Sequence, residues 1–332
     1  MTLRAPSQEV PQVELLHSMK RLRCVEEAIA ARYSEERMRC PVHLSVGQES
    51  VSAAVGLALA PTDLAVSGHR AHTHYLAKGG SMPRLLAEIY GKRAGCSRGK
   101  GGSMHLIDEG VGFKGSTAIV AGTIPIGTGL GLSISLRNSQ QVACVFFGDA
   151  AVEEGVFFEA VNFAAVRRLP VLYLCENNFY SVYSPLRVRQ PEGRRIHEMV
   201  AGLGVSVAHG DGNDPELVYR MASDALVAIR AGGGPVFLEF TTYRYREHCG
   251  PNFDNDLGYR TEAEFLRWRA ADPVETYEAR LLDSGVITRQ SLVAMEAEIV
   301  AEVTAAFAFA EASPFPEPVD AYRDLYSGEG GE

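Results

Sequence analysis

Three short apolar runs constrain the fold of this chain most. They cover residues 141–147, 170–175 and 235–240, and they are rich in the branched and aromatic side chains that favour buried strands. Helical patterns separate them, at 152–168 and 215–231. Strand, helix, strand at this spacing is typical of the βαβ unit. Several such units in series predict an α/β protein with a mostly parallel sheet and helices on both faces.

Length and composition limit the classes of protein to which the chain can belong. Its 332 residues suffice for one large domain or two modest ones, and an apolar content of 46% excludes a disordered protein. The formal net charge is −9, so a nucleic-acid binder with a broad basic surface is excluded as well. We therefore expect a globular protein that handles small molecules or docks to protein partners.

The absence of targeting signals and the cysteine usage indicate a cytoplasmic protein. The first residues carry charges where a signal peptide needs an apolar stretch, and no run of about 18 uncharged apolar residues is present to span a membrane. The six cysteines are irregularly spaced and form no CxxC pair, which argues against a disulfide scaffold or a zinc site. We expect neither a membrane partner nor a nucleic-acid partner.

Three regions of different pattern divide the chain. Residues 1–40 form an N-terminal helical segment, in which apolar side chains at a spacing of three predict one amphipathic helix over 11–38. Residues 41–260 form the α/β domain, with a further short strand expected at 64–67. Residues 261–332 are expected to form a helical C-terminal extension, whose apolar positions pack either on the chain's own core or on a partner.

Glycine is concentrated in one stretch of the chain. Twelve of the 33 glycines lie between Gly91 and Gly131. Such density is typical of loops whose bare backbone must approach something closely. Ordinary turns and closely packed helices would produce the same composition, and both interpretations stay open.

The clearest candidate site follows two of the predicted strands. Gly148 and Asp149 stand between the first strand and a helix, and Asn178 follows the next strand along the chain. Ligands of α/β proteins bind at the carboxyl ends of parallel strands, where a helix N-terminus offers free N–H groups to a phosphate. A carboxylate beside a phosphate is repulsive unless a cation lies between them. Asp149 therefore indicates a Mg²⁺ or Ca²⁺ ion.

Asn178 and a backbone carbonyl near Tyr180 would complete the protein's share of this cation site. The crossover between neighbouring strands brings Asn178 to the same edge of the sheet as Asp149, and its side-chain oxygen suits a hard cation. Taken singly, Asp149 has a simpler interpretation as a helix cap and Asn178 as a turn residue. The combination at this spacing favours the cation site.

The surroundings of these residues resemble a known family. Seven motifs appear in the family's order: HLSVGQES, SGHRAH, GKGGSMH, IVAGTIPIGTG, GDAAVEEG, ENNFYS and TYRYREH. They are similar to the α subunit of the thiamine diphosphate-dependent 2-oxo acid dehydrogenases, of the pyruvate and acetoin dehydrogenase type, over roughly residues 15–312. The resemblance implies the diphosphate-binding type of thiamine diphosphate fold, with thiamine diphosphate and Mg²⁺ as cofactors.

The resemblance also implies roles for individual residues. The metal ligands would be Asp149, Asn178 and the backbone carbonyl of Tyr180. Two histidines would be catalytic, His248 on an active-site loop and His72 at the mouth of the active site. The implied cofactor-binding set is His69, Arg70, Ala118, Val120, Gly148, Asp149, Ala150, Ala151, Asn178, Tyr180 and His248.

Four positions depart from the family's pattern. Ala150 replaces the second glycine of the metal motif, so its methyl group must fit near the cofactor, which requires a negative φ. His69 stands where tyrosine is common, and Ala118 where glycine or serine is common. Cys249 follows His248 at the position of a serine that some relatives phosphorylate, so we expect no such phosphorylation here.

One component of the implied chemistry is missing from this chain. In the family, the glutamate that activates the aminopyrimidine ring belongs to a β subunit with a pyrimidine-binding domain. This chain has one diphosphate-type crossover and too little further length for a second α/β domain. Glu49 is not that glutamate, because the family places the GQE motif in the α subunit. We expect an obligate β partner, in an α2β2 assembly.

Three functions remain open on this evidence. The first is decarboxylation of a small-molecule 2-oxo acid, with pyruvate as the first substrate or acetoin cleavage beside it, and acyl transfer to a lipoyl carrier on an acyltransferase core. The second is a thiamine diphosphate-dependent decarboxylase or carbon–carbon ligase subunit in a biosynthetic pathway. The third is a non-catalytic structural or regulatory paralogue. It predicts eroded ligands, whereas Asp149, Asn178, Arg70 and His248 are all present.

Overall fold

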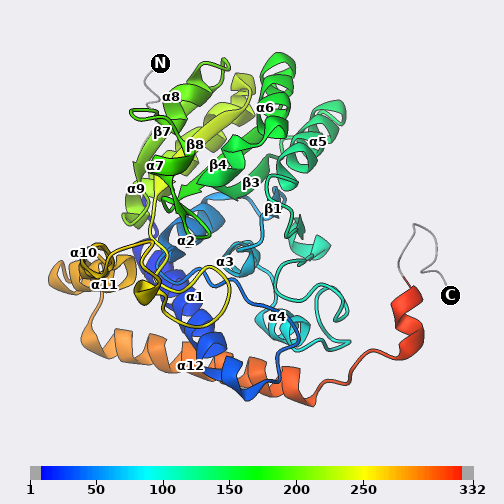
Figure 1. The fold of residues 1–332 in the computed structure, drawn as a ribbon, viewed down its shortest axis with the longest axis vertical. Coiled ribbons are helices and arrows are strands. Elements are labelled where there is room, and N and C mark those ends of the chain that lie inside the picture. The colour runs from blue at the N-terminus through cyan, green and yellow to red at the C-terminus, as the bar shows by residue number, and fades with distance from the viewer. Residues whose placement is uncertain (1–8, 324–332) are drawn as a thin grey trace.

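A six-stranded sheet lies at the centre of the computed structural model, which describes residues 9–323 (Figure 1). The strand order is β2-β1-β3-β4-β8-β7, and each neighbouring pair is parallel. The strands are β1 Leu64–Ser67, β2 Phe113–Ser116, β3 Ala143–Gly148, β4 Val171–Asn177, β7 Ser206–Asp211 and β8 Val236–Thr241. A short antiparallel pair joins β5 Tyr180–Ser181 to β6 Ser184–Pro185. The expected α/β class and parallel sheet are confirmed.

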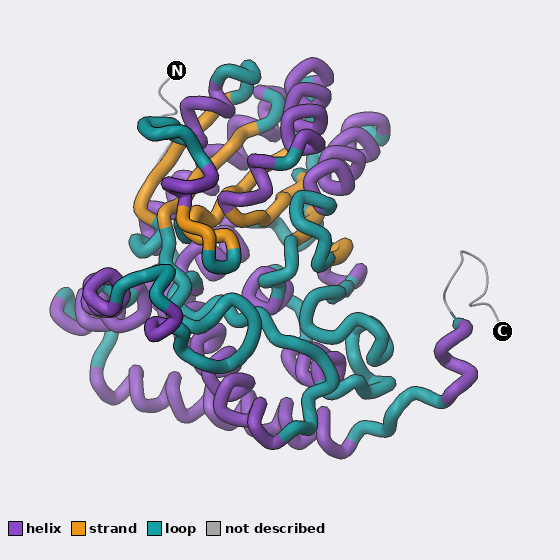
Figure 2. The backbone as a smooth tube through the Cα atoms, in the orientation of Figure 1, coloured by secondary structure: helices purple, strands orange, loops and turns teal. Residues whose placement is uncertain are grey.

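Helices cover both faces of this sheet. On one face lie α5, α6 and α8, and on the other lie α2 and α9, backed by α1, α3, α4, α11 and α12. Figure 2 shows loops gathered between the sheet and the lower helices of the view. The helices are α1 Gln12–Arg32, α2 Glu49–Ala58, α3 His72–Ala77, α4 Met82–Ile89, α5 Thr123–Leu136, α6 Gly155–Arg167, α7 Leu186–Arg189, α8 Ile196–Ala201, α9 Pro215–Ala228, α10 Glu262–Ala270, α11 Pro273–Asp283 and α12 Arg289–Ala312.

Two apolar cores separate along the strands because successive side chains point to opposite faces. On β3, Cys144 and Phe146 join the core beneath α2 and α9, whereas Val145 and Phe147 join the core beneath α5 and α6. Both faces of the central strands are therefore buried. This explains why these strands are continuous apolar runs in the sequence.

The expected strands are present, with ends displaced by one or two residues, whereas two helix boundaries were wrong. The helix expected over 11–38 ends at Arg32, because a short 3₁₀ turn follows and Glu36 takes a left-handed φ of 56°. The helix expected over 152–168 begins only at Gly155, since Asp149–Glu153 forms a separate 3₁₀ turn. Edge strands β2 and β7 were not anticipated, because both are only partly buried and lack a continuous apolar run.

Part of the glycine-rich stretch is helical rather than looped. Helix α5 contains Gly127 and Gly131, which face the sheet. A Cβ at Gly127 would lie 2.2 Å from Cγ2 of Val145, and one at Gly131 would lie 2.4 Å from Cγ2 of Val171. These two glycines therefore allow α5 to pack closely on β3 and β4, as the helix-packing interpretation proposed.

Another part of the stretch wraps around a buried carboxylate. Glu88, at the end of α4, is fully buried and accepts four backbone N–H groups from the loop that follows. The donors are Ser97 at 2.8 Å, Gly99 at 2.9 Å, Gly101 at 2.6 Å and Gly102 at 3.2 Å. The backbone of this loop does approach another group closely, as expected, but that group is the Glu88 carboxylate of the same chain.

The C-terminal extension packs on the chain's own helices over much of its length. Helix α12 lies against α1 and α4, and it buries Leu292, Ile299, Val303 and Phe307 in the larger core. The expected regions 1–40 and 261–332 both extend beyond the described residues. Among the described helices, none combines the length and apolar character needed to cross a bilayer.

Candidate cofactor-binding and active site

The carboxyl ends of β3 and β4 open into a single cavity. Gly148 at the end of β3 pairs in register with Glu176 of β4, so the segments that follow the two strands start side by side. The cavity holds about 970 Å³ of free space with its open mouth included. All eleven residues of the expected cofactor-binding set line it: His69, Arg70, Ala118, Val120, Gly148, Asp149, Ala150, Ala151, Asn178, Tyr180 and His248.

Asp149 is the buried acid of this cavity. It starts the 3₁₀ turn Asp149–Glu153, and its side chain is almost completely enclosed. Burial raises the pKa of Asp149, while the guanidinium of Arg189, which donates to its Oδ2, acts in the opposite direction. A positive group is thus already drawn to this carboxylate, and the position suits a cation.

Asn178 presents a second oxygen from the neighbouring strand end. Its Nδ2 donates to Oε1 of Gln48 at 3.3 Å, and its Oδ1 accepts the Tyr180 N–H at 3.2 Å. Gln48 is itself held by Thr242, whose Oγ1 accepts from Nε2 at 3.2 Å. These bonds orient the amide and leave Oδ1 one lone pair. Carboxylate and amide oxygens are ligands that Mg²⁺ prefers, so the donor set fits a divalent ion.

Arg70 provides a positive charge in the same cavity. Its guanidinium donates to the backbone carbonyls of Leu44 at 2.5 Å and His248 at 3.2 Å. Burial and the nearby Arg244 lower the pKa of Arg70 to about 9. In the described chain both of its hydrogen bonds go to carbonyl oxygens, so its charge is left for an anion, and a guanidinium fork suits a diphosphate.

The start of the 3₁₀ turn supplies backbone donors to the same anion. Ala150 and Ala151 line the cavity, and their N–H groups lack helical partners because they begin the turn. Ala150 is not among the residues with a positive φ, so the conformation that its methyl group requires is present. These residues fit a diphosphate group together with a divalent cation.

Strained backbone surrounds the cavity. Ala121 has a φ of 63°, Phe179 of 70° and Val182 of 54°, in the left-handed region that non-glycine residues rarely adopt. Ala121 and Val182 line the cavity, and Phe179 lies between Asn178 and Tyr180. Such strain clusters at functional sites, where the surrounding structure holds it in place.

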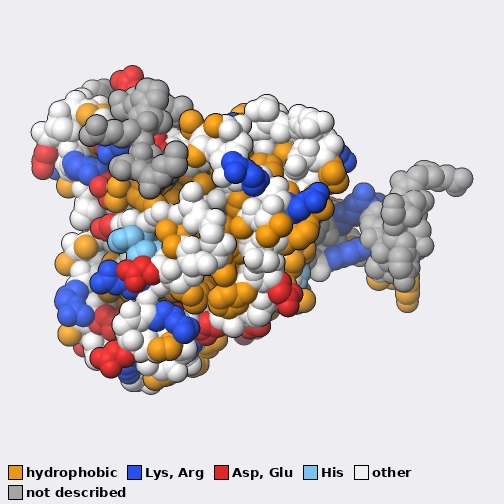
Figure 3. All heavy atoms as spheres, turned by 90° about the horizontal axis from the view of Figure 1, so that it is seen from above, with side chains coloured by type: hydrophobic (Ala, Val, Ile, Leu, Met, Phe, Trp, Pro, Cys, Tyr) orange, Lys and Arg blue, Asp and Glu red, His pale blue; other side chains and the backbone are white. Residues whose placement is uncertain are grey.

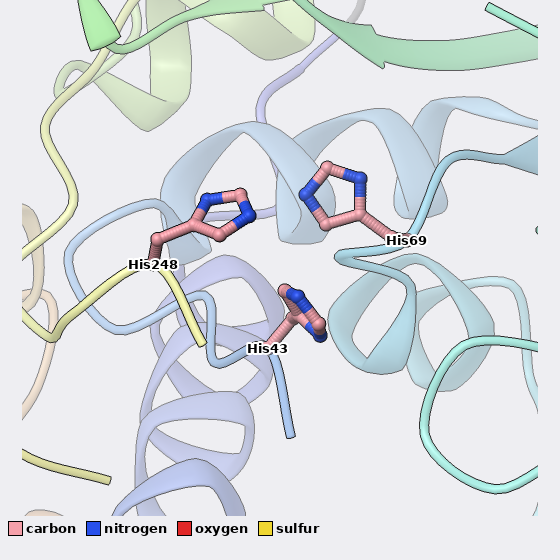
Figure 4. A group of neighbouring side chains, drawn as sticks. All are labelled: His43, His69 and His248. Carbon is pink, nitrogen blue, oxygen red and sulfur yellow. The ribbon is translucent and has the colours of Figure 1, made fainter. Parts of the chain in front are cut away.

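Three histidines meet at one side of the cavity, although only two of them were expected there (Figure 4). His43 precedes α2, His69 follows β1, and His248 lies on the loop after β8. Their ring centroids are 4.9 to 5.3 Å apart, and one nitrogen of each lies within 4.8 Å of the others. We refer to His43, His69 and His248 as the histidine trio.

The histidine trio is held in its neutral form. Burial, followed by the charge of Arg70, lowers the pKa of His43 to about 2, of His69 to about 4 and of His248 to about 3. Neutral imidazoles are able to bind metal ions. The same Arg70 charge repels a cation, however, so the trio is better suited to hydrogen bonds with an anionic oxygen compound.

His72 does not occupy the place expected for it. It is fully buried, and its Nδ1 lies 2.8 Å from Oε1 of Glu26 while its Nε2 lies 2.7 Å from Oγ of Ser103. Both ring nitrogens are therefore engaged away from the cavity lining. The expectation of a histidine at the mouth was wrong for this residue, because burial on α3 could not be read from the HRAH motif. His72 instead connects α1 to the glycine-rich loop.

Glu49 also points away from the cavity. It is fully buried, forms an ion pair with Arg23, and accepts the N–H of Gly47 at 3.0 Å. Its role is to join α1 to the start of α2. This agrees with the expectation that Glu49 is not the activating glutamate.

Sequence reasoning missed three further features of the site. His43 joins the trio, although its HLSVGQES motif was available as a signal. His74 lies 2.9 Å from Glu176, and both line the cavity. Arg189 reaches Asp149 from α7, in a segment with no pattern that would have indicated it.

Comparison with known proteins identifies the class that this fold and site define. The model of the dehydrogenase E1 component family matches residues 17–319. The chain therefore belongs to the dehydrogenase E1 component family, and it is a component of an oxidoreductase. Membership implies thiamine diphosphate as the cofactor, in agreement with the fit of the cavity.

Three similar proteins carry a more specific name than the family does, pyruvate dehydrogenase E1 component subunit alpha. A pyruvate dehydrogenase E1 component subunit alpha from Rhizobium meliloti is 36% identical over 284 residues, which is 85% of this chain and 80% of the relative. One from Rickettsia conorii is 33% identical over 95% of both chains. The mitochondrial subunit alpha of Dictyostelium discoideum is 33% identical over 96% of this chain and 82% of its own.

Proposed function

We propose that this chain is the α subunit of a thiamine diphosphate-dependent 2-oxo acid dehydrogenase. It would decarboxylate a 2-oxo acid, with pyruvate as the first candidate, and pass the acyl group to a lipoyl carrier on an acyltransferase core. The observation that supports this most is one cavity that joins Asp149 and Asn178, from adjacent strand ends, to an Arg70 guanidinium left free for an anion. The names of the similar proteins support the same substrate.

Three residues would hold a Mg²⁺ ion: Asp149 and Asn178 by their side chains, and Tyr180 by its backbone carbonyl. Arg70 and the first N–H groups of the 3₁₀ turn would bind the diphosphate. The bound cofactor supplies a nucleophilic carbon and an electron sink for decarboxylation. The protein's part is to orient that group and to exclude water from the reacting end.

The histidine trio would face the substrate. A 2-oxo acid carries a carboxylate and a carbonyl, and both accept hydrogen bonds. Neutral imidazoles donate such bonds without the repulsion that a second positive charge beside Arg70 would add. We assign to His248 the donor that holds a proton at the substrate's carbonyl oxygen, and to His43 and His69 the orientation of its carboxylate.

A partner subunit would complete the site. An E1 α subunit implies a partner and a complex, and we propose a β subunit that carries the pyrimidine-binding domain and the activating glutamate, in an α2β2 assembly in the cytoplasm. Figure 3 views the end of the molecule that carries α5, α6 and α8, and apolar side chains are frequent there. The most exposed on α5 and α6 are Leu136 and Val166, at 71% and 72%.

The test is reconstitution with the β partner. The two subunits are purified together, and decarboxylation of pyruvate, of a panel of 2-oxo acids and of acetoin is measured with an artificial electron acceptor and with lipoyl domains. We expect turnover only when both subunits, thiamine diphosphate and Mg²⁺ are present. Complete inactivity toward every compound, with the cofactor demonstrably bound, would overturn the proposal.

A second function is favoured by the entrance loop alone. The loop that carries Cys249 departs from the family's usual sequence, and a changed entrance would suit a decarboxylase or carbon–carbon ligase subunit that uses the same cofactor. In the assay above, this alternative predicts release of carbon dioxide without transfer to the lipoyl domain.

A further inference from the structure

Arg189 pairs with the buried carboxylate that would bind the metal ion. Its Nη2 bonds to Oδ2 of Asp149, and its Nη1 lies 2.5 Å from Oε1 of Glu153. Its Nε donates to the carbonyl of Ser184 at 3.0 Å. All three guanidinium nitrogens are thus engaged, and the Arg189 side chain is only 9% exposed although α7 lies at the surface.

The charges at this point explain the contact. Asp149 is a buried carboxylate, and a buried charge without a partner is costly. Glu153 adds a second negative charge beside it. In the described chain the guanidinium of Arg189 is the positive partner of the Asp149 carboxylate. A divalent ion bound to Asp149 would also neutralise this carboxylate. The ion and the Arg189 guanidinium would then repel each other, because both are positive and close to the same group.

The segment that carries Arg189 also carries the other proposed ligands. Asn178 and Tyr180 lead into the β5–β6 hairpin, and α7 follows it directly. The N–H of Leu186 returns to the carbonyl of Phe179 at 2.9 Å, which closes the segment on itself. A change at Arg189 is therefore coupled by a short chain path to the residues that would bind the metal.

From this geometry we propose that Arg189 is an internal cation that pairs with Asp149 in the cofactor-free chain and is displaced from this carboxylate when the divalent ion binds. The inference rests on the proposed function, because it takes Asp149 as a ligand of the ion. Arg189 would then set how tightly the ion binds, since each binding event must break the contacts with Asp149 and Glu153.

The test compares Arg189→Gln with Arg187→Gln in the complex with the β partner. The first substitution keeps a polar side chain but removes the charge, and Arg187 is an exposed residue on the same short helix. Titration calorimetry with Mg²⁺ at saturating thiamine diphosphate measures the affinity. We expect R189Q to bind Mg²⁺ about tenfold more tightly than the wild type, within the usual range of coupling between sites. We expect R187Q to match the wild type, and R189K to restore weaker binding.

A second measurement, of the melting temperature, distinguishes a change in metal binding from a general loss of stability. Because the contact exists only without the ion, R189Q should melt at a lower temperature than the wild type in the cofactor-free state, and the difference should vanish or reverse with Mg²⁺ and thiamine diphosphate. Equal or weaker Mg²⁺ binding by R189Q, or the same loss of melting temperature in both states, would overturn the inference alone. Failure of the wild type to bind the ion and cofactor would instead overturn the proposed function, and the inference with it.

Discussion

At the scale of single residues, burial and neighbouring charge decide what each group of the cavity can do. Asp149 is a buried carboxylate with the Arg189 guanidinium beside it, and the hydrogen bonds of Arg70 go to carbonyl oxygens. The histidine trio is neutral because burial and the positive charge of Arg70 both disfavour the protonated form of its rings.

The role of Asp149 is tested by its amide. Asp149→Asn keeps the shape of the side chain but removes the charge that neutralises a divalent ion, so we expect binding of thiamine diphosphate with Mg²⁺ to fall at least about 100-fold. Glu154→Gln is the matched control, because Glu154 is an exposed carboxylate directly after the same turn and does not line the cavity. Calorimetry that shows unchanged affinity in D149N would contradict the assignment.

His248 should separate turnover from binding. His248→Ala removes a donor to the substrate without touching the proposed metal ligands, so we expect cofactor affinity to change little and kcat to fall about 100-fold. Steady-state assays of the reconstituted complex measure both. The exposed His209 of β7, which does not line the cavity, provides the control variant His209→Ala. Full activity of H248A on the natural substrate would show that another group holds the proton.

The histidine trio also predicts how stability depends on pH. The folded-state pKa values of about 2, 4 and 3 lie below the ordinary value of 6.5, so the unfolded chain binds more protons between these limits. Stability is then fully present above about pH 6.5 and is lost as the pH falls. The urea concentration at the midpoint of unfolding should be lower at about pH 5.5 than at about pH 7.5. This decrease should be smaller in the double variant H43N/H248N. An equal drop in that variant would be evidence against the trio.

At the scale of elements, close approach decides the packing of α5. Its glycines looked like loop residues because glycine disfavours helices in isolation. Two of them face β3 and β4 so closely that no side chain fits, and the packing of the apolar remainder of α5 outweighs the low helix propensity.

A pair of substitutions on α5 tests this account. Gly127→Ala places a methyl group 2.2 Å from Cγ2 of Val145, and we expect it to lower the free energy of unfolding by about 1–3 kcal/mol. Gly129→Ala meets nothing within 4 Å and should raise that free energy by about 0.5–1 kcal/mol. Denaturant unfolding of the two variants measures both effects. The same sign in both would contradict the packing argument.

At the scale of the whole molecule, the cavity is open and one end of the protein is apolar. The helices α5 and α6 carry the exposed apolar residues Ile126, Leu136, Phe163 and Val166. Exposed apolar patches of this kind mark protein interfaces. A partner subunit seated along α5 and α6 would bury this patch.

A charge on this patch should weaken assembly. Val166→Asp places a carboxylate on the apolar face of α6, and we expect the dissociation constant for the β partner to rise at least about tenfold. Val293→Asp on α12 is the control, since Val293 is 64% exposed at the opposite side of the fold. Sedimentation of the mixed subunits measures assembly. Normal assembly of V166D would place the interface elsewhere.

The sequence alone determined the central strands, the parallel sheet and the strand-end residues Asp149 and Asn178. These follow from local patterns, since an apolar run and the turn after it are encoded by adjacent residues, and parallel strands bring their carboxyl ends to one edge. The sequence motifs likewise led to the family that the comparisons show.

Only the tertiary structure decided which side chains share the cavity and which are buried behind it. His43, His69 and His248 come from three distant segments, and His72, two residues from Arg70, turns instead into the core. Arg189 reaches Asp149 across 40 positions of the chain. Such contacts depend on how whole elements pack, and no local pattern carries that information, because each partner's position is set by the rest of the fold.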